Sequence, residues 1–286
     1  MLSTLLRQNV GLFLPDALRT FPRLVKPQFE RKIKVDFVAR DYRVKTVETQ
    51  AELKQVLGLR RSVFHYEFAK KWISLKSDKD EFDDVADHLA IFDEKTGKIA
   101  GVYRLIPSHV SRRFYSNTEF DISNFLGIPG NKLELSRACI NKEYRNGVVI
   151  SLLWKGIAEY ARAADTDYLF GLSSMTTVDQ RKIALVCKYF QDKGLEDLSY
   201  SIAPRAKYRI DDFETVLAAA CAETAGATPA EDVSALIPSL VKSYIRAGAR
   251  VCSRPVIDRD FNCADWLTVL NMRKMTTSYE RKYGQA

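Results

Sequence analysis

Hydrophobic and polar positions along this chain repeat with two periods, one typical of strands and one typical of helices. Short apolar or alternating runs predict strands at residues 42–47, 88–92, 99–106, 132–140, 168–172 and 266–270. Helical spacing predicts helices at residues 49–66, 149–163, 178–191, 211–225 and 235–247. The runs at 88–92 and 99–106 flank a turn-forming segment, which predicts a β-hairpin. This order of elements predicts an α/β fold with a mixed central sheet flanked by helices.

The chain contains no internal repeat and no strong linker, which predicts a single domain over residues 41–286 with a helical insertion around 209–248. Residues 1–40 form a separate arm in this prediction. Within it, residues 1–34 mix leucine and phenylalanine with seven basic and two acidic residues. That composition is typical of a segment that binds a membrane surface. The alternative is an arm that packs on the domain.

Arg60 is an anomaly on the predicted helix 49–66, because the other positions on its face are apolar. A guanidinium on a buried face is costly unless a carboxylate pairs with it. Six carboxylates follow in one acidic segment and are candidate partners: Asp78, Asp80, Glu81, Asp83, Asp84 and Asp87. In the alternative interpretation, the Arg60 side chain reaches solvent.

Charged residues also interrupt two predicted strands. Arg104 lies within 99–106, and Glu134 and Arg137 lie within 132–140. Strict alternation places Glu134 and Arg137 on opposite faces of the sheet unless a bulge intervenes. A strand with one face in solvent is the alternative explanation for these charges.

A turn between the predicted strand 132–140 and the predicted helix 149–163 contains Arg145 and Gly147. Free backbone N–H groups at the start of a helix, next to an arginine, form an anion-binding site. The sequence contains no phosphate-binding loop of the G-x-x-x-x-G-K-[ST] type, no G-x-G-x-x-G and no G-x-S-x-G. The common nucleotide-binding and serine-hydrolase motifs are therefore excluded.

Composition adds limits on the class of protein. With 46% apolar and 28% charged residues, the chain has the composition of a globular protein, and no apolar run is long enough to span a membrane. Five cysteines without a C-x-x-C pair and three histidines predict reduced thiols and no metal site. The start of the chain lacks the pattern of a secretory signal, so a cytoplasmic location is expected. A net charge of +8 indicates an anionic partner.

The unusual charged positions form an ordered series that resembles the motifs of acyl-homoserine-lactone synthases, which are acyltransferases with the GNAT fold. The series comprises Leu59-Arg60-x-x-Val63-Phe64, Trp72, Asp80-Glu81-Phe82-Asp83, Gly101-x-x-Arg104-Leu105 and Glu134-Leu135-Ser136-Arg137. Trp72 lies two positions later than in lactone synthases, which argues against a homoserine-lactone product.

The chain more closely resembles the ornithine-lipid N-acyltransferases, a related group often labelled hemolysin-like. The segments that carry this resemblance are 83–89, 101–105, 133–140, 144–157, 238–249 and the tail Asp258-x-x-Phe261-x-x-x-Asp265. The resemblance extends from about residue 40 to residue 275 and does not include the N-terminal arm.

This resemblance implies transfer of a long-chain fatty acyl group, with or without a 3-hydroxyl, to the amine of an amino acid such as ornithine, giving a lyso-aminolipid. Glu134 is the implied acceptor of the amine proton, and His88 relays protons or makes a structural hydrogen bond. The implied acceptor-site residues are Arg60, Asp80, Asp83, Arg104, Ser136 and Arg137. The turn implied to hold the donor comprises Arg145, Asn146, Gly147, Val148 and Val149. Because no covalent intermediate is required, Cys139 is expected to be a core residue.

The implied donor is an acyl-phosphopantetheine thioester carried by acyl carrier protein, with acyl-CoA as the alternative, and no metal or tightly bound cofactor is expected. Acyl carrier protein is acidic, which suits the basic net charge. A membrane-bound product suits an enzyme peripheral to the inner membrane, and nucleic acid is not expected as a partner. Two alternatives remain. One is another N-acyl amino acid or lactone-type synthase, and the other is a non-catalytic membrane- or nucleic-acid-binding protein on the same fold.

Overall fold

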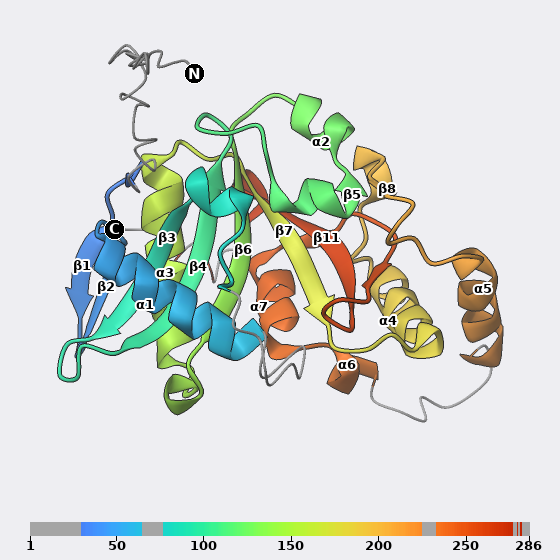
Figure 1. The fold of residues 1–286 in the computed structure, drawn as a ribbon. Helices are drawn as coiled ribbons and strands as arrows, with labels where there is room; N and C mark the ends of the chain where they lie inside the picture. The colour runs from blue at the N-terminus through green and yellow to red at the C-terminus, as the bar shows by residue number, and fades with distance from the viewer. Residues whose placement is uncertain (1–29, 65–76, 225–232, 277–278, 280, 282–286) are drawn as a thin grey trace, which may run out of the picture.

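The computed structural model describes residues 30–64, 77–224, 233–276, 279 and 281. Their centre is a nine-stranded sheet with the spatial order β1-β2-β3-β4-β6-β7-β11-β10, and β9 also pairs with β11 (Figure 1). Its strands are β1 (Asp36–Ala39), β2 (Tyr42–Thr46), β3 (Asp87–Asp93), β4 (Ile99–Pro107), β6 (Lys132–Ile140), β7 (Tyr168–Met175), β9 (Arg250–Val251), β10 (Val256–Asp258) and β11 (Cys263–Asn271). Only β6 and β7 pair in parallel within this sheet. The predicted mixed sheet is confirmed.

Helices cover both faces of the sheet (Figure 1). They are α1 (Gln50–Arg61), α2 (Ser123–Gly127), α3 (Val148–Ala163), α4 (Gln180–Asp192), α5 (Phe213–Thr224), α6 (Val233–Leu236) and α7 (Ser239–Ala247). Val102 of β4 packs with the apolar side of α1, whereas the next residue, Tyr103, packs with α3. Successive residues of a strand point to opposite faces, so α1 and α3 lie on opposite sides of the sheet. A small second sheet pairs β5 (Phe120–Asp121) with β8 (Ala203–Pro204).

Most of the predicted elements are present, and the differences have local causes. The predicted hairpin forms β3 and β4, and the predictions at 132–140 and 149–163 form β6 and α3. The predicted helix 235–247 is divided into α6 and α7, because Pro238 cannot donate a helical hydrogen bond and precedes the first residue of α7. Strands of two to four residues, such as β9 and β10, are too short to show a period and were not predicted.

The predicted N-terminal arm overlaps the sheet at its end. Residues 36–39 form β1 and pair with β2, so the sheet begins inside the segment 1–40. The backbone N–H groups of Lys32 and Ile33 donate to the Asp87 carboxylate at 2.9 and 2.8 Å, which attaches this stretch to β3. Residues 1–29 lie outside the described residues, as do Trp72 and the link at 225–232. None of the described helices is both long enough and apolar enough to cross a lipid bilayer.

A bulge in β6 decides where its charged side chains point. Over two residues of β4, the partners on β6 advance by three, from Ser136 to Cys139. Arg137 sits in this bulge with a φ of 51°, in the left-handed region of backbone conformation. The extra residue reverses the alternation. Arg137 therefore lies on the same face as Glu134, whereas strict alternation predicts opposite faces.

The parallel strands β6 and β7 separate along their length. Their pairing runs from Lys132 and Tyr168 to Glu134 and Phe170 and then stops. A side chain at Gly171 would overlap the carbonyl oxygen of Leu135, so the next residue of β7 must be glycine for the strands to approach this closely. Beyond this point the facing backbone groups of β6 and β7 no longer pair with each other, and a cavity opens between the strands.

Candidate functional site

Arg60 is fully buried and paired with two aspartates. Its Nε donates to Asp78 Oδ2 at 2.7 Å, and its Nη1 donates to Asp83 Oδ1 at 2.6 Å. Nη2 donates to Asp83 Oδ2 at 3.2 Å and to the Asp78 carbonyl oxygen at 2.9 Å. Arg60 lies on the buried, mostly apolar face of α1, and these carboxylates neutralise its charge. Of the two interpretations of Arg60, the structure selects the buried pair.

Two further arginines meet at Asp80. Arg104 Nη1 donates to Asp80 Oδ1 at 2.5 Å, and Arg137 Nη2 donates to Asp80 Oδ2 at 3.1 Å. Arg104 also donates from Nε to Ser136 Oγ at 3.0 Å, and its Nη1 lies 3.3 Å from Asp83 Oδ1. These contacts join the pairs around Arg60 and the pairs around Asp80 into one group. We call it the ionic network, and its charged residues are Arg60, Asp78, Asp80, Asp83, Arg104 and Arg137. All six residues predicted for the acceptor site are therefore neighbours: Arg60, Asp80, Asp83, Arg104, Ser136 and Arg137.

The charges inside the ionic network keep Asp83 ionised. Burial opposes ionisation of Asp83, but the guanidinium of Arg60, with help from Arg104, lowers the pKa of Asp83 well below its usual value. His88 is also buried, and its Nε2 lies 3.6 Å from Asp83 Oδ1. Burial, with repulsion from Arg60, lowers the pKa of His88 to about 3. At neutral pH this imidazole is uncharged, so it is positioned beside the network without contributing charge to it.

Glu134 is held by the segment that precedes β5. Its Oε2 accepts the backbone N–H of Tyr115 at 2.8 Å, and its Oε1 accepts that of Ser116 at 2.6 Å. These amides begin the short 3₁₀ helix η4 (Tyr115–Thr118). Burial raises the pKa of Glu134, and the hydrogen bonds from Ser116 and Tyr115 oppose the rise. Glu134, the predicted proton acceptor, is therefore a fully buried carboxylate. Its two hydrogen bonds fix the start of η4.

The ring of Tyr115, whose backbone N–H is bound by Glu134, stacks on the guanidinium of Arg137. The Arg137 guanidinium carbon lies 4.7 Å from the centre of the Tyr115 ring and 5.6 Å from that of Phe261. Arg104 lies over the same tyrosine at 5.4 Å. Stacking of this kind suits a planar guanidinium. Arg137 is also the most exposed arginine of the network, with 11% side-chain exposure against 0% for Arg60 and Arg104.

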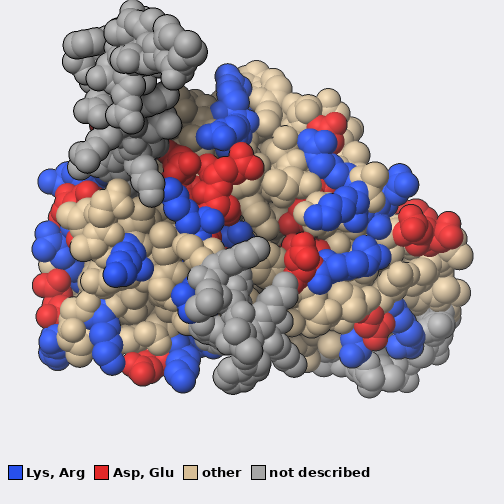
Figure 2. Space-filling view, viewed as in Figure 1, with Lys and Arg blue, Asp and Glu red and all other residues tan. Residues whose placement is uncertain are grey.

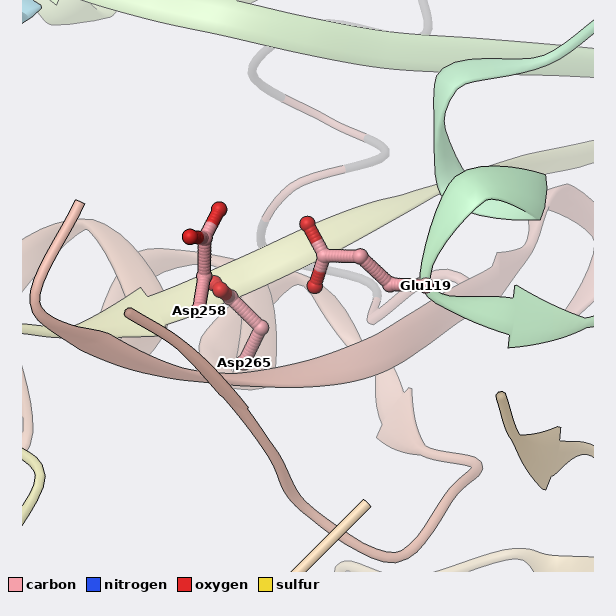
Figure 3. Close-up of side chains that lie close together, drawn as sticks. All are labelled: Glu119, Asp258 and Asp265. Carbon is pink, nitrogen blue, oxygen red and sulfur yellow. The ribbon is translucent and has the colours of Figure 1, made fainter. Parts of the chain in front are cut away.

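A cluster of three carboxylates, which was not predicted, includes the residue that ends η4. Glu119, Asp258 and Asp265 are all buried, and one oxygen of each lies within 4.8 Å of the others. Figure 3 shows the three side chains converging from β10, β11 and the end of η4. We call these residues the acidic cluster.

The acidic cluster has unusual electrostatics. Burial, followed by the charges of Asp265 and Asp258, raises the pKa of Glu119 to about 9. Burial raises the pKa of Asp265 to about 6, although Ser174 and Cys263 donate hydrogen bonds to it. Two of the three positions, Asp258 and Asp265, belong to the tail pattern in the sequence, but no pattern marked Glu119. Glu119 is far from Asp258 and Asp265 in the chain, so the cluster could be recognised only after these segments were brought together.

A cavity between β6 and β7 is the second part of the site. Its walls are the separated strands, with Leu135 on β6 and residues 169–173 on β7, together with Thr268 and Leu270 of β11. Trp154 of α3 and Tyr244 of α7 also line it. Their rings meet edge to face with centres 5.7 Å apart, and Tyr244 Oη lies 2.6 Å from Tyr103 Oη. The lining is mainly apolar, which suits an acyl or pantetheine chain.

The turn predicted to hold the donor lies at the start of α3. Gly147 has a φ of 83° and immediately precedes α3, and Asn146 Oδ1 accepts the N–H of Val148 at 3.1 Å. Arg145 Nε donates to the carbonyl oxygen of Ile140 at 3.0 Å, and the Val149 side chain is buried. Because β6 leads into this turn, the start of α3 lies at the end of the sheet where β6 and β7 have separated. The turn therefore lies beyond the part of β6 that pairs with β7.

The surface around the site carries both signs of charge. Figure 2 shows Lys and Arg side chains spread over this face of the molecule. Acidic side chains gather in the region of the short 3₁₀ helix η3 (Glu81–Asp84), next to the ionic network (Figure 2). Cys139, in contrast, is buried, and burial raises the pKa of its thiol to about 12, as expected for a core residue. The arrangement offers paired charges for a polar acceptor and an apolar cleft for an acyl chain.

Comparison with known proteins gives matches to acyltransferases. Residues 59–155 match the acetyltransferase (GNAT) domain family. An L-ornithine N(alpha)-acyltransferase of Rhizobium meliloti is 32% identical over 220 residues, which cover 73% of this chain and 71% of the relative. A protein of the same name from Brucella abortus is 28% identical over 262 residues, covering 84% and 88%.

The solved structures that match this chain include FeeM, an N-acyl amino acid synthase from uncultured soil microbes. It matches with a TM-score of 0.47 and 10% identity, covering 83% of this chain and 94% of FeeM. Identity and coverage with the Rhizobium meliloti relative, together with the GNAT domain, show that this chain is an acyltransferase and belongs to the L-ornithine N(alpha)-acyltransferase family.

Proposed function

We propose that the protein transfers a long-chain acyl group, with or without a 3-hydroxyl, from a phosphopantetheine thioester to the α-amine of L-ornithine. The observation that carries this proposal is that one strand, β6, borders both parts of the site: Leu135 lines the mainly apolar opening, and Arg137 belongs to the ionic network. The names of the relatives support ornithine as the acceptor. The product would be a lyso-aminolipid.

The donor would enter the opening between β6 and β7. Its acyl or pantetheine chain would contact the apolar lining, and backbone N–H groups of the separated strands would stabilise the oxyanion. The start of α3, with Arg145 beside it, would bind the phosphate of the phosphopantetheine. We assign acyl carrier protein as the carrier, with acyl-CoA as the alternative. The net charge of +8 supports an acidic protein partner.

The acceptor would approach from the charged face. Arg137 is the candidate for binding its carboxylate, since a guanidinium matches this group and Arg137 is the most exposed arginine of the network. Asp80 and the rings of Tyr115 and Phe261 would hold the guanidinium in place. Arg60, Asp83 and Arg104 would then act behind it, as positioning residues.

The chemical step requires loss of one amine proton. The amine nitrogen attacks the thioester carbon, the N–C bond forms, the C–S bond breaks, and the pantetheine sulfur leaves and takes up a proton. Glu134 is our candidate to accept the amine proton through an intervening water, because both of its oxygens are held by amides. Its raised pKa supports this role, since a base is more effective when its pKa is nearer the working pH. His88 stays neutral and positions Asp83 in this scheme.

A direct assay tests the proposal. Purified full-length protein is supplied with long-chain acyl carrier protein or acyl-CoA and a panel of acceptors including ornithine, glutamine and S-adenosylmethionine. Mass spectrometry should detect Nα-acylornithine, formed faster with acyl carrier protein than with acyl-CoA. Amide formation on another acceptor, with none on ornithine, would overturn the acceptor assignment. A preference for acyl-CoA would overturn the assignment of the carrier alone.

A further inference from the structure

The acidic cluster concentrates three buried carboxylates in one place. Glu119 is 1% exposed, Asp265 is 2% exposed and Asp258 is 5% exposed, so three carboxylates share a site that water scarcely reaches. In the described part of the chain, none of them forms an ion pair with a lysine or arginine. Arg137 and Lys207 lower the pKa of Glu119 only in part. Buried carboxylates without a counter-charge are costly.

One atom of the cluster is unpaired. Glu119 Oε2 is buried and has no hydrogen-bond partner among the described residues. The other two side chains are anchored: Asp258 Oδ1 accepts the N–H groups of Asp260 and Phe261, and Asp265 accepts from Ser174 and Cys263. Figure 3 shows Glu119 directed toward these two anchored carboxylates. A buried oxygen directed at fixed carboxylates points to a ligand with several donors.

We propose that the acidic cluster binds the side-chain ammonium group of the amino acid acceptor. This inference rests on the proposed function, because it assigns one end of the acceptor that Arg137 binds at the other. An ammonium has three donors and no acceptor, so three carboxylates, each contributing one oxygen, match it.

The spacing of the oxygens agrees with an ammonium. Three acceptors placed 2.8 Å from a tetrahedral nitrogen are about 4.6 Å apart. The ligand atoms of the cluster lie within 4.8 Å of one another. Mg²⁺ and Ca²⁺ prefer six or more oxygen ligands, more than three carboxylates supply with one oxygen each. An ammonium group, with three donors, fits the cluster within the 4.8 Å limit.

The position of the cluster relative to Arg137 also fits an amino acid. Phe261 packs under the Arg137 guanidinium at 5.6 Å, and its backbone N–H donates to Asp258 Oδ1 at 3.2 Å. Tyr115 stacks on the same guanidinium, and η4 leads from it directly to Glu119. Two separate elements thus join the carboxylate-binding candidate to the acidic cluster. A short side chain between a carboxylate and an ammonium would bridge them.

This arrangement would also select which amine reacts. Carboxylates around the side-chain ammonium favour its charged form, and a protonated amine has no lone pair with which to attack a thioester. The α-amine, outside the cluster, would lose its proton to the base and be acylated. The cluster would therefore reject amino acids that lack a side-chain cation, because they would leave its carboxylates buried and unpaired.

The test compares ornithine with norvaline, which has the same carbon chain without the side-chain amine. Acylation is measured with a long-chain acyl carrier protein in the presence of EDTA, for the wild-type protein and for Glu119→Gln and Asp265→Asn. We expect the wild-type kcat/KM for ornithine to exceed that for norvaline by about 10²-fold or more. Each variant should reduce this ratio by about 10–100-fold, mainly through the KM for ornithine, and leave norvaline unchanged. Asp260→Asn, an exposed carboxylate of the same loop, is the matched control and should keep the ratio.

A binding measurement separates this inference from the proposed function. In thermal-shift titrations, ornithine should stabilise the wild-type protein more than norvaline does, and Glu119→Gln should remove the difference. If ornithine is not acylated, the proposed function fails, and this titration still decides the inference. Equal thermal stabilisation of the wild-type protein by ornithine and norvaline would overturn the inference. Formation of Nα-acylornithine would still support the proposed function in that case. Binding of Mg²⁺ or Ca²⁺ that Glu119→Gln abolishes, with the ornithine preference intact, would also overturn the inference.

Discussion

Replacing Asp83 by asparagine tests whether the ionic network stabilises the fold as well as the site. Asparagine has nearly the same shape but no charge, so Arg60 loses its contacts at 2.6 and 3.2 Å as ion pairs, and Arg104 loses one at 3.3 Å. Both guanidinium groups stay buried. Breaking a buried pair by removing one partner costs about 3–5 kcal/mol, because the remaining charge is uncompensated.

The expected change in melting temperature follows from the chain length. An unfolding entropy of about 2.1 cal/mol/K per residue gives about 0.6 kcal/mol/K for 286 residues. A loss of 3–5 kcal/mol should therefore lower Tm by about 5–8 °C. Thermal denaturation followed by circular dichroism measures this shift. Acyltransferase activity should fall as well, because Asp83 helps to place the arginines beside the acceptor.

The next residue along the chain supplies the control. Asp84 is on the same 3₁₀ helix, but its side chain is 51% exposed, and its ion-pair partner among the described residues is Lys79 at the surface. Asp84→Asn should cost less than about 1 kcal/mol. Since the pKa of Asp83 is lowered in the folded protein, its contribution to stability is present above about pH 4 and is lost as the pH falls further. The difference between wild type and Asp83→Asn should therefore narrow in acid. Equal melting of the two variants at pH 7 would refute the reasoning.

The other predictions concern the base, the opening between strands, the acidic cluster and the arm. Glu134→Gln should lower turnover by about 10²–10⁴-fold, and a rate within tenfold of wild type would exclude it as the base. Gly171→Ala should raise the KM for the acyl donor because its Cβ would overlap β6, whereas Gly127→Ala, where a Cβ meets no atom within 4 Å, should have no effect. Because the folded-state pKa of Glu119 is raised to about 9, unliganded protein should lose stability as pH rises toward 9, and Glu119→Gln should flatten that slope in thermal melts. A chain lacking residues 1–29 should stay folded and active but lose co-sedimentation with anionic vesicles at low salt; unchanged vesicle binding would contradict a membrane role for this segment.

The chain from residue 30 onward makes contacts with the sheet that no sequence pattern indicates. Lys32 and Ile33 donate their backbone N–H groups to the buried Asp87 carboxylate, so a longer deletion removes part of the fold. The basic and apolar composition predicts an arm over 1–40, but composition does not mark where an extended segment joins a sheet. The edge strand β1 begins inside that range.

The charged residues show what local pattern can and cannot determine. Arg60 was recognisable because it breaks an apolar helical face, and Asp83 was recognisable as one of several nearby carboxylates. Which carboxylate pairs with which arginine depends on side-chain packing, and the bulge at Arg137 turned that residue toward Glu134. A bulge adds one residue to one strand, so it alters the face of every later side chain, and alternation alone does not reveal it.

By itself, the sequence determined the order of the main strands and helices and the ordered charged motifs, because these depend on periods and neighbours within a few residues. Only the tertiary structure showed that Glu119, Asp258 and Asp265 lie together in the acidic cluster. Asp258 and Asp265 lie close in the chain, but Glu119 is more than a hundred residues away. Each of these carboxylates is an ordinary polar residue in its own segment. Their shared burial, and the raised pKa that follows from it, exist only after β10, β11 and the end of η4 have packed together.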